Sequence, residues 1–210
     1  MWQSCLAYLS WSPFFFFKQK TAYEFVFGDW SSVVCSSDLC ADAEAVRRRV
    51  TPAYLADMAE ITTPGCIGPC PACRAKGLPW HPNGQWHWRA DEPNALTCRA
   101  CKTVFPHPEH PETVQVRSSW DPRQVYGFMG GDTFECFSYK RARPSISGII
   151  RANKFMHLAR ELDTVAKAYA LAGRVEDARC AKAILLRVAE VFPKYTVRAG
   201  YGYGEYADCD

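Results

Sequence analysis

The sequence has little excess charge and no region dominated by charge of one sign. Its 25 lysines and arginines stand against 22 aspartates and glutamates in 210 residues, a formal net charge of +3. Proteins that bind nucleic acid usually carry a basic patch or stripe, and nothing in this chain approaches one. We therefore expect no nucleic-acid partner.

The sequence also lacks a long apolar run, and residues 40–210 contain no internal repeat or low-complexity stretch. The most apolar segment surrounds Phe14–Phe17 and is interrupted by Trp11 and Pro13. It is too short and too broken to cross a membrane. It also lacks the preceding basic residues and the small-residue cleavage site of a signal peptide. We therefore expect no membrane partner, and no true secretion signal is visible.

Residues 14–39 resemble a translated sequencing-library adapter. The string KQKTAYE at 18–24 is similar to one part of that translation and GDWSSVVCSSDL at 28–39 to another, with Val33 where aspartate is expected. The two blocks follow the adapter's order. We therefore exclude residues 1–39 from fold reasoning, expecting them to be non-native, to be disordered or to form an arbitrary helix, and not to pack against the rest, with the natural start upstream. The alternative is a genuine apolar leader.

Cysteine, in contrast, is abundant, with 11 residues. Cys70-Pro71-Ala72-Cys73 and Cys98-Arg99-Ala100-Cys101 form two Cys-x-x-Cys pairs separated by residues 74–97. Each pair can form a tight turn that directs two thiolates to one point, and two such turns make the tetrahedral cage that zinc prefers. Cys70, Cys73, Cys98 and Cys101 are thus predicted to bind structural Zn²⁺, because four thiolates leave no open coordination position.

Two alternatives remain for these cysteines, and other ligands could replace one of them. An extracytoplasmic location would permit disulfides, and a redox Cys-x-x-Cys is the third interpretation, although no βαβ pattern supports it. Cys66, His81 or His87 could substitute for a ligand, but each is more typical of a surface or packing residue.

The residues around the cysteines predict short strands. Pro82-Asn83-Gly84 predicts a turn, and Trp86-His87-Trp88 alternates as a half-buried strand would. Residues 113–143 are strand-like and rich in aromatic side chains. These aromatic side chains could form a carbohydrate platform, although a packed sheet face is favoured; they are Trp120, Tyr126, Phe128, Phe134, Phe137 and Tyr139.

Helices are predicted on both sides of this region. Thr51-Pro52 has the signature of a helix start within a helical lead-in at 40–65. Pro144-Ser145 starts a long helix that Gly173 ends, and a second helix follows, ending at Pro193. The two helices form an antiparallel hairpin with facing apolar stripes, predicted as Leu158, Leu162, Val165 and Tyr169 on the first and Ala178, Ala181, Leu185, Val188 and Phe192 on the second.

The phrase AYALAG at 168–173, with DARCA at 177–181 and ILLRVAEVFPKY at 184–195, resembles the toroid domain of heparinase II/III-like polysaccharide lyases. The resemblance covers about residues 66–206 and implies an (α/α) toroid, a C-terminal β-sandwich and β-elimination on uronic-acid polysaccharides. No catalytic position of that family can be placed on this sequence, so the fragment itself is expected to be inactive.

The expected fold class is therefore α+β, with a zinc-ribbon-like β module followed by a helical hairpin that is part of an incomplete (α/α) toroid. The expected divisions are 1–39 (non-native), 40–65 (helical lead-in), 66–112 (zinc-ribbon-like module), 113–143 (short β-rich segment) and 144–210 (start of the toroid, truncated).

The tail after the second helix interleaves tyrosine with glycine. Tyrosine rings can stack on sugars, so an acidic polysaccharide is the expected partner of the parent protein, in the periplasm or outside the cell; an aromatic packing role is the equal alternative. The candidate substrate-binding residues are Arg198, Tyr201, Tyr203, Glu205 and Tyr206. The rival hypothesis for the whole chain is a non-enzymatic zinc-ribbon interaction module.

Overall fold

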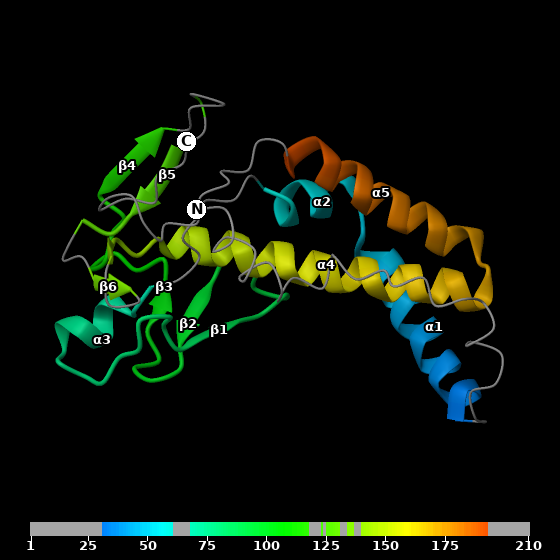
Figure 1. Ribbon diagram of the computed structural model, residues 1–210, viewed down its shortest axis with the longest axis horizontal. Coiled ribbons are helices and arrows are strands. Elements are labelled where there is room, and N and C mark those ends of the chain that lie inside the picture. Colours follow the sequence, from blue (N-terminus) through cyan, green and yellow to red (C-terminus); the bar gives the residue numbers. More distant parts are fainter. Residues whose placement is uncertain are drawn as a thin grey trace, which may run out of the picture.

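The computed structural model describes residues 31–60, 68–117, 123, 125–130, 134–136 and 140–192. Its elements are arranged along one long helix, α4 (Ile146–Ala172) (Figure 1). Small antiparallel sheets and the short helix α3 (Pro71–Ala75) lie at the N-terminal end of α4. Helices α1 (Ser31–Arg49), α2 (Pro52–Met58) and α5 (Val175–Val191) lie along the rest of it. The α+β class and the helical hairpin are confirmed, and the described residues form no toroid.

A three-stranded antiparallel sheet carries the second cysteine pair. Its order is β1 (Trp86–Trp88), β2 (Leu96–Cys98) and β3 (Val104–Phe105). Trp86 and Trp88 are half-buried while His87 is exposed, as the alternation predicted. The predicted turn before β1 is present, with Gly84 at φ 73°, a left-handed conformation that glycine adopts without strain.

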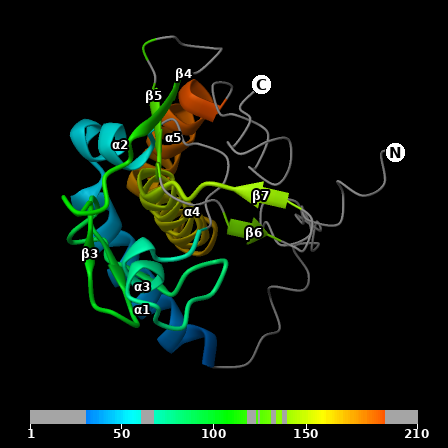
Figure 2. The ribbon, with the colours of Figure 1, turned by 90° about the vertical axis from the view of Figure 1, so that its left-hand side faces the viewer.

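Two hairpins follow in the chain. β4 (Val114–Arg117) pairs with β5 (Val125–Phe128), and β6 (Phe134–Cys136) pairs with β7 (Lys140–Ala142). Figure 2 shows β6 and β7 on one side of α4 and α1 and α2 on the other. Tyr126 and Phe128 are fully buried, so these two rings pack in the interior and are not a carbohydrate platform. Trp120, Phe137 and Tyr139 lie outside the described residues.

Local capping sets the ends of α4, as the sequence predicted. The Ser145 hydroxyl accepts a hydrogen bond from the Gly148 N–H at 3.1 Å and donates one to the Gly127 carbonyl at 2.7 Å. The first contact satisfies an N–H that the helix leaves unpaired, and the second joins the helix to β5. Gly173 ends α4 at φ 66°. Thr51 caps α2 in the same way, with Pro52 in its first turn.

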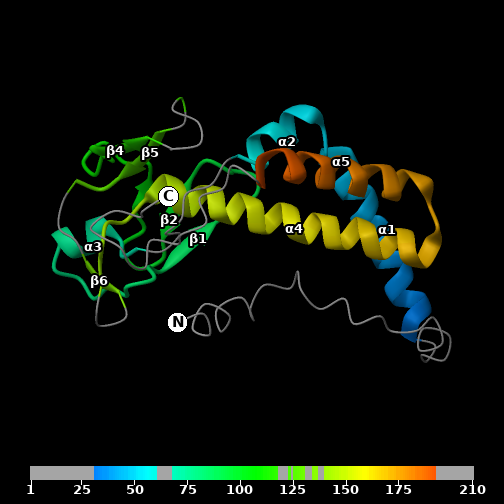
Figure 3. The same ribbon diagram turned by 45° about the horizontal axis from the view of Figure 1, so that its top comes forward.

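The interior contains two apolar cores, and α4 contributes to both. The helical core contains Val46, Leu55, Leu158, Val165 and Ile184, among others. The module core combines Cys70, Cys73, Leu96 and Phe105 with Ile146, Ile149 and Ile150 of the first turns of α4. Trp88 is half-buried against both cores. Figure 3 shows α5 and α2 beside α4, with α1 crossing it.

The buried face of α5 differs from the predicted one. The buried residues are Asp177, Cys180, Ile184 and Val191, whereas the predicted Leu185 and Phe192 are 50% and 62% exposed. On α4, Ala168 is buried and the predicted Tyr169 is exposed. The prediction followed apolar residues only, but Asp177 lies inside because Arg47 and Arg174 form ion pairs with it.

A buried carboxylate joins α1, α2 and α4. Glu161 is 3% exposed and accepts hydrogen bonds from Arg49 Nε at 3.0 Å and from the Tyr54 hydroxyl at 2.6 Å. His157 Nε2 lies 3.4 Å from Glu161 Oε1. Burial acts to raise the pKa of Glu161, but these three neighbours outweigh it and hold the pKa below its ordinary value. The carboxylate is therefore charged in the folded protein.

Helix α1 crosses the boundary expected at residue 39. It begins at Ser31, within the segment that resembles adapter sequence, and Leu39 is partly buried against the helical core. The expectation that this segment makes no packing contact is therefore wrong at Leu39.

Candidate metal centre

The first cysteine pair lies at the start of a short helix. Cys70 is the N-terminal cap residue of α3, and Pro71 occupies its first turn. The Arg74 N–H donates to the Cys70 carbonyl at 3.1 Å, and the Leu78 N–H donates to the Cys73 carbonyl at 2.9 Å. Residues three apart share one side of a helical turn, so the two thiols face the same way.

The second pair lies in the tight connection between β2 and β3. Cys98 ends β2, and the Lys102 N–H donates to its carbonyl at 2.9 Å. The Cys98 N–H in turn donates to the Thr103 carbonyl at 2.9 Å. Lys102 adopts φ 63°, a left-handed conformation that returns the chain to β3 directly after Cys101.

The fold brings all four predicted thiols together. Cys70 Sγ lies 3.7 Å from Cys101 Sγ, and Cys73 Sγ lies 3.6 Å from Cys98 Sγ. Four metal–sulfur bonds of about 2.3 Å in a tetrahedron place the sulfurs about 3.8 Å apart, whereas a disulfide joins them at about 2.05 Å. The four cysteines are free, so the structure has the geometry of a metal site and does not contain the disulfides considered above. The cluster could hold a metal ion such as zinc.

The four thiols lie in a largely buried site, and burial changes their acidity. Cys70, Cys73 and Cys98 are buried, and Cys101 is half-buried. Burial raises the pKa of Cys70 above its ordinary range and that of Cys73 to about 11. Burial acts the same way on Cys101, but hydrogen bonds with Thr103 and the neighbouring thiols lower its pKa to about 6. A divalent cation would stabilise all four thiolates.

Neither of the two alternative histidines belongs to the four-cysteine cluster. His81 and His87 are both exposed, and neither is among the four grouped ligands, although His81 borders the small hollow beside Cys70, Cys73 and Cys98. Cys66 lies outside the described residues. The five candidate substrate-binding residues of the tail also lie outside them: Arg198, Tyr201, Tyr203, Glu205 and Tyr206.

A second group of metal-ligating side chains was missed by the sequence reasoning. His107, Glu109 and His110 place their ligand atoms within 4.8 Å of one another. The signal was present as His-x-Glu-His, which is weak by itself because the spacing fixes no geometry until the loop is folded.

Comparison with known proteins gives no family assignment. No family model, no curated protein and no solved structure matches the chain. None of the helices in the described part of the chain has both the length and the apolar character needed to span a bilayer.

Proposed function

We propose that Cys70, Cys73, Cys98 and Cys101 bind one structural zinc ion. The observation that carries this proposal is the 3.6 Å and 3.7 Å spacing of the paired sulfurs in a buried cluster. Soft thiolate ligands in a tetrahedron favour zinc over magnesium or calcium. Because four thiolates fill the coordination shell and leave no open position, the ion stabilises the module and does not catalyse a reaction.

The zinc would act at the junction of the two ends of the molecule. Cys70, Cys73 and Cys98 share the module core with Ile146, Ile149 and Ile150 at the start of α4. An ion that joins α3 to the β2–β3 connection therefore also fixes the surface against which α4 packs.

Metal analysis of the purified chain tests this proposal. We expect about one zinc per chain, lost in the Cys98→Ser, Cys101→Ser double variant and retained in Cys40→Ser, which removes a thiol outside the cluster. Substitution with Co²⁺ on the unchanged sequence should give the charge-transfer absorption of a thiolate site. A chain with no metal and oxidised thiols would contradict the proposal.

At the level of biological activity, we propose that the chain is an N-terminal part of a heparinase II/III-like polysaccharide lyase and is itself inactive. The support is the resemblance of residues 168–195 together with the helical hairpin of α4 and α5. The outer side of this hairpin exposes large apolar residues, which the next helix pair of an (α/α) toroid would cover; they are Leu171, Val175, Leu185, Leu186 and Phe192. The parent would act on an acidic polysaccharide in the periplasm or outside the cell, with the tyrosine-rich tail near the substrate.

The gene tests the lyase proposal. A downstream reading frame that encodes further helix pairs and then a β-rich domain is the expected result. A stop codon soon after Asp210 would contradict it. The same sequencing tests the adapter resemblance, which is overturned if residues 14–39 are encoded in native genomic DNA.

A non-enzymatic interaction module is the second candidate, favoured by the same exposed apolar side chains. Its nucleic-acid form is the weaker one, because the stretch between the cysteine pairs offers only Arg74, Lys76 and Arg89 against Asp91 and Glu92, and Arg89 is paired with Asp91 at 2.9 Å. A protein-binding module predicts a reading frame that ends without further helix pairs, and this result separates the two candidates.

A further inference from the structure

The loop after β3 holds two histidines and a glutamate in a fixed arrangement. A β-bridge joins His107 to His110, and the His110 N–H donates to the His107 carbonyl at 3.0 Å. The two imidazole centroids are 5.6 Å apart. The backbone therefore sets the separation of the two rings, and Glu109 lies between them in the chain.

The ring of a buried phenylalanine packs against both histidines. Phe105 is fully buried, and its ring centroid lies 6.2 Å from that of His107 and 6.0 Å from that of His110. Both histidines are half-buried while Glu109 is exposed. The imidazoles are thus held in place before any ligand binds, which is what a precise metal site requires.

The hydrogen bonding of His107 is compatible with coordination. Its Nδ1 accepts a hydrogen bond from the Glu109 N–H at 3.3 Å, a long contact for such a bond. A neutral imidazole has one lone pair, and this contact places it on Nδ1. Coordination through either ring nitrogen therefore costs this hydrogen bond: a metal ion on Nδ1 replaces the amide, and coordination through Nε2 requires the tautomer that is protonated on Nδ1.

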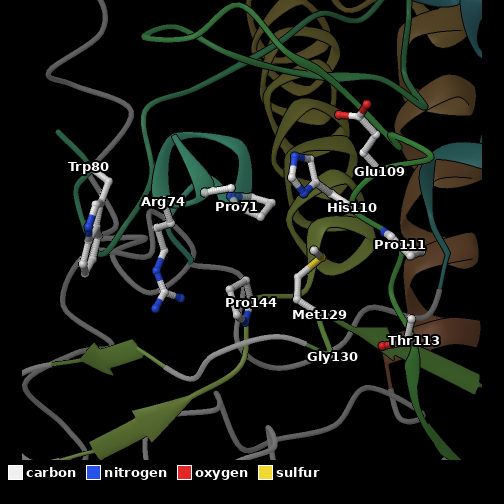
Figure 4. Close-up of a pocket in the computed structure, with 11 residues that line it drawn as sticks. Pro71, Arg74, Trp80, Glu109, His110, Pro111, Thr113, Met129, Gly130 and Pro144 are labelled. Atoms are coloured by element: carbon white, nitrogen blue, oxygen red, sulfur yellow. The ribbon is translucent and has the colours of Figure 1, made fainter. Parts of the chain in front are cut away.

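One side of the group borders a cavity of about 500 Å³. Glu109 and His110 lie on one wall, and Arg74 and Trp80 lie across from them (Figure 4). The Arg74 guanidinium lies over the Trp80 ring, 5.4 Å from its centroid. His107 does not line this cavity, so the three side chains lie at its edge.

We propose that His107, Glu109 and His110 bind a second zinc ion at the edge of this cavity, with a fourth coordination position left open. Two imidazoles and one carboxylate are a ligand set that zinc accepts with one position left for solvent. One carboxylate neutralises only half the charge of the ion, so the open position favours water, hydroxide or a small anion. This site differs in kind from the four-cysteine cluster, which has no open position.

Calorimetric titration of the full chain with Zn²⁺ tests the second site. The protein is first dialysed so that only tightly held metal remains, and we expect one further binding event per chain. The His107→Ala, His110→Ala double variant should abolish this event, and Glu109→Gln should weaken it at least about tenfold. The matched control is His81→Ala, His87→Ala, which also removes two histidines but should leave the event unchanged.

The outcomes separate this proposal from the structural zinc. Loss of the tightly held metal in the Cys98→Ser, Cys101→Ser variant tests the first site only. The second site is tested by whether the second binding event disappears in the His107→Ala, His110→Ala variant. The proposal is overturned if no second binding event is seen. It is also overturned if that event persists in the His107→Ala, His110→Ala variant. If that variant fails to fold, as judged by circular dichroism, the exposed Glu109 decides: unchanged affinity in Glu109→Gln overturns it.

Discussion

The carboxylate of Glu161, on α4, bonds to residues of two other helices, α1 and α2. It is 3% exposed and accepts hydrogen bonds from Arg49 of α1 and Tyr54 of α2. A buried charge that loses its partners is costly, because it must be desolvated without compensation. The contribution of this residue to stability therefore depends on its charge as well as on its shape.

Glu161→Gln keeps the shape and removes the charge. We expect it to lower the free energy of unfolding by about 2 kcal/mol, below the usual range for a fully buried pair because the Arg49 side chain is half-exposed. Urea denaturation followed by circular dichroism measures this change. Asp163→Asn is the matched control, since its pair with Lys167 is exposed on the same helix and should be near neutral; equal effects would contradict the argument.

Gly84 is constrained both by its backbone and by its neighbours. Gly84 and Gly77 adopt φ 73° and 63°, but a Cβ at Gly84 would collide with the Trp86 indole nitrogen, whereas one at Gly77 meets nothing within 4 Å. The indole also donates a hydrogen bond to the Gly68 carbonyl at 3.0 Å. Comparing alanine variants at the two positions therefore distinguishes the cost of backbone strain from the cost of steric crowding.

Gly77→Ala should cost about 1 kcal/mol from left-handed strain. Gly84→Ala should cost about 2 kcal/mol more, because the indole must also move. Thermal unfolding of both variants measures the difference, with Trp86 fluorescence as a local reporter. If the two variants are equally stable, the crowding around Trp86 does not control this turn.

At the scale of the element, the start of α4 depends on one buried hydroxyl. Ser145 is fully buried and serves both the Gly148 N–H and the Gly127 carbonyl. Thr51 caps α2 through the Tyr54 N–H alone and is exposed. The two caps are chemically alike but differ in burial and in the number of partners.

Ser145→Ala should lower the free energy of unfolding by about 2 kcal/mol, since it removes both the cap and the hydrogen bond to the half-buried Gly127 carbonyl. Thr51→Ala should cost about 1 kcal/mol or less. Equilibrium unfolding in urea compares them directly. Equal losses would show that the bond to Gly127 contributes nothing to the stability of α4.

Helix ends were predictable because their signals are local. Thr51-Pro52, Ser145 and Gly173 act on backbone groups within one turn, so the residue types alone locate the boundaries. The buried face of α5 was not predictable in this way. Asp177 lies inside because Arg47, from a distant part of the chain, pairs with it, and no pattern within α5 carries that information.

At the scale of the molecule, α4 connects two separate cores. Ile146, Ile149 and Ile150 belong to the cysteine-containing core, and Leu158, Val165 and Ala168 belong to the helical core. Of the two cores, only the cysteine-containing core would include the proposed zinc ligands. The two ends should therefore respond differently to removal of the metal.

A strong zinc chelator should open the module and leave most of the helical end folded. Metal binding and folding are coupled in small thiolate sites, and cores of different stability can open separately. Hydrogen exchange should show loss of protection in β1 to β3, with protection retained in α5 and the second half of α4. Uniform loss along the whole chain, or no loss, would contradict the division into two cores.

The sequence by itself determined the four-cysteine cluster, the strand pattern of residues 86–88 and the hairpin of α4 and α5. These features rest on spacing, alternation and capping, which operate over a few residues. The cysteine prediction joined two distant pairs successfully because each Cys-x-x-Cys turn already orients two thiols. The fold then had only to bring the two turns into contact.

Only the tertiary structure decided which groups from distant segments meet. It placed Glu161 against Arg49 and Tyr54, turned Asp177 inward and Leu185 outward, and brought His107, Glu109 and His110 together beside a cavity. Burial of a charged group is favourable only when partners from other elements compensate its desolvation. That compensation depends on the packing of the whole chain, which residue types in a local window do not specify.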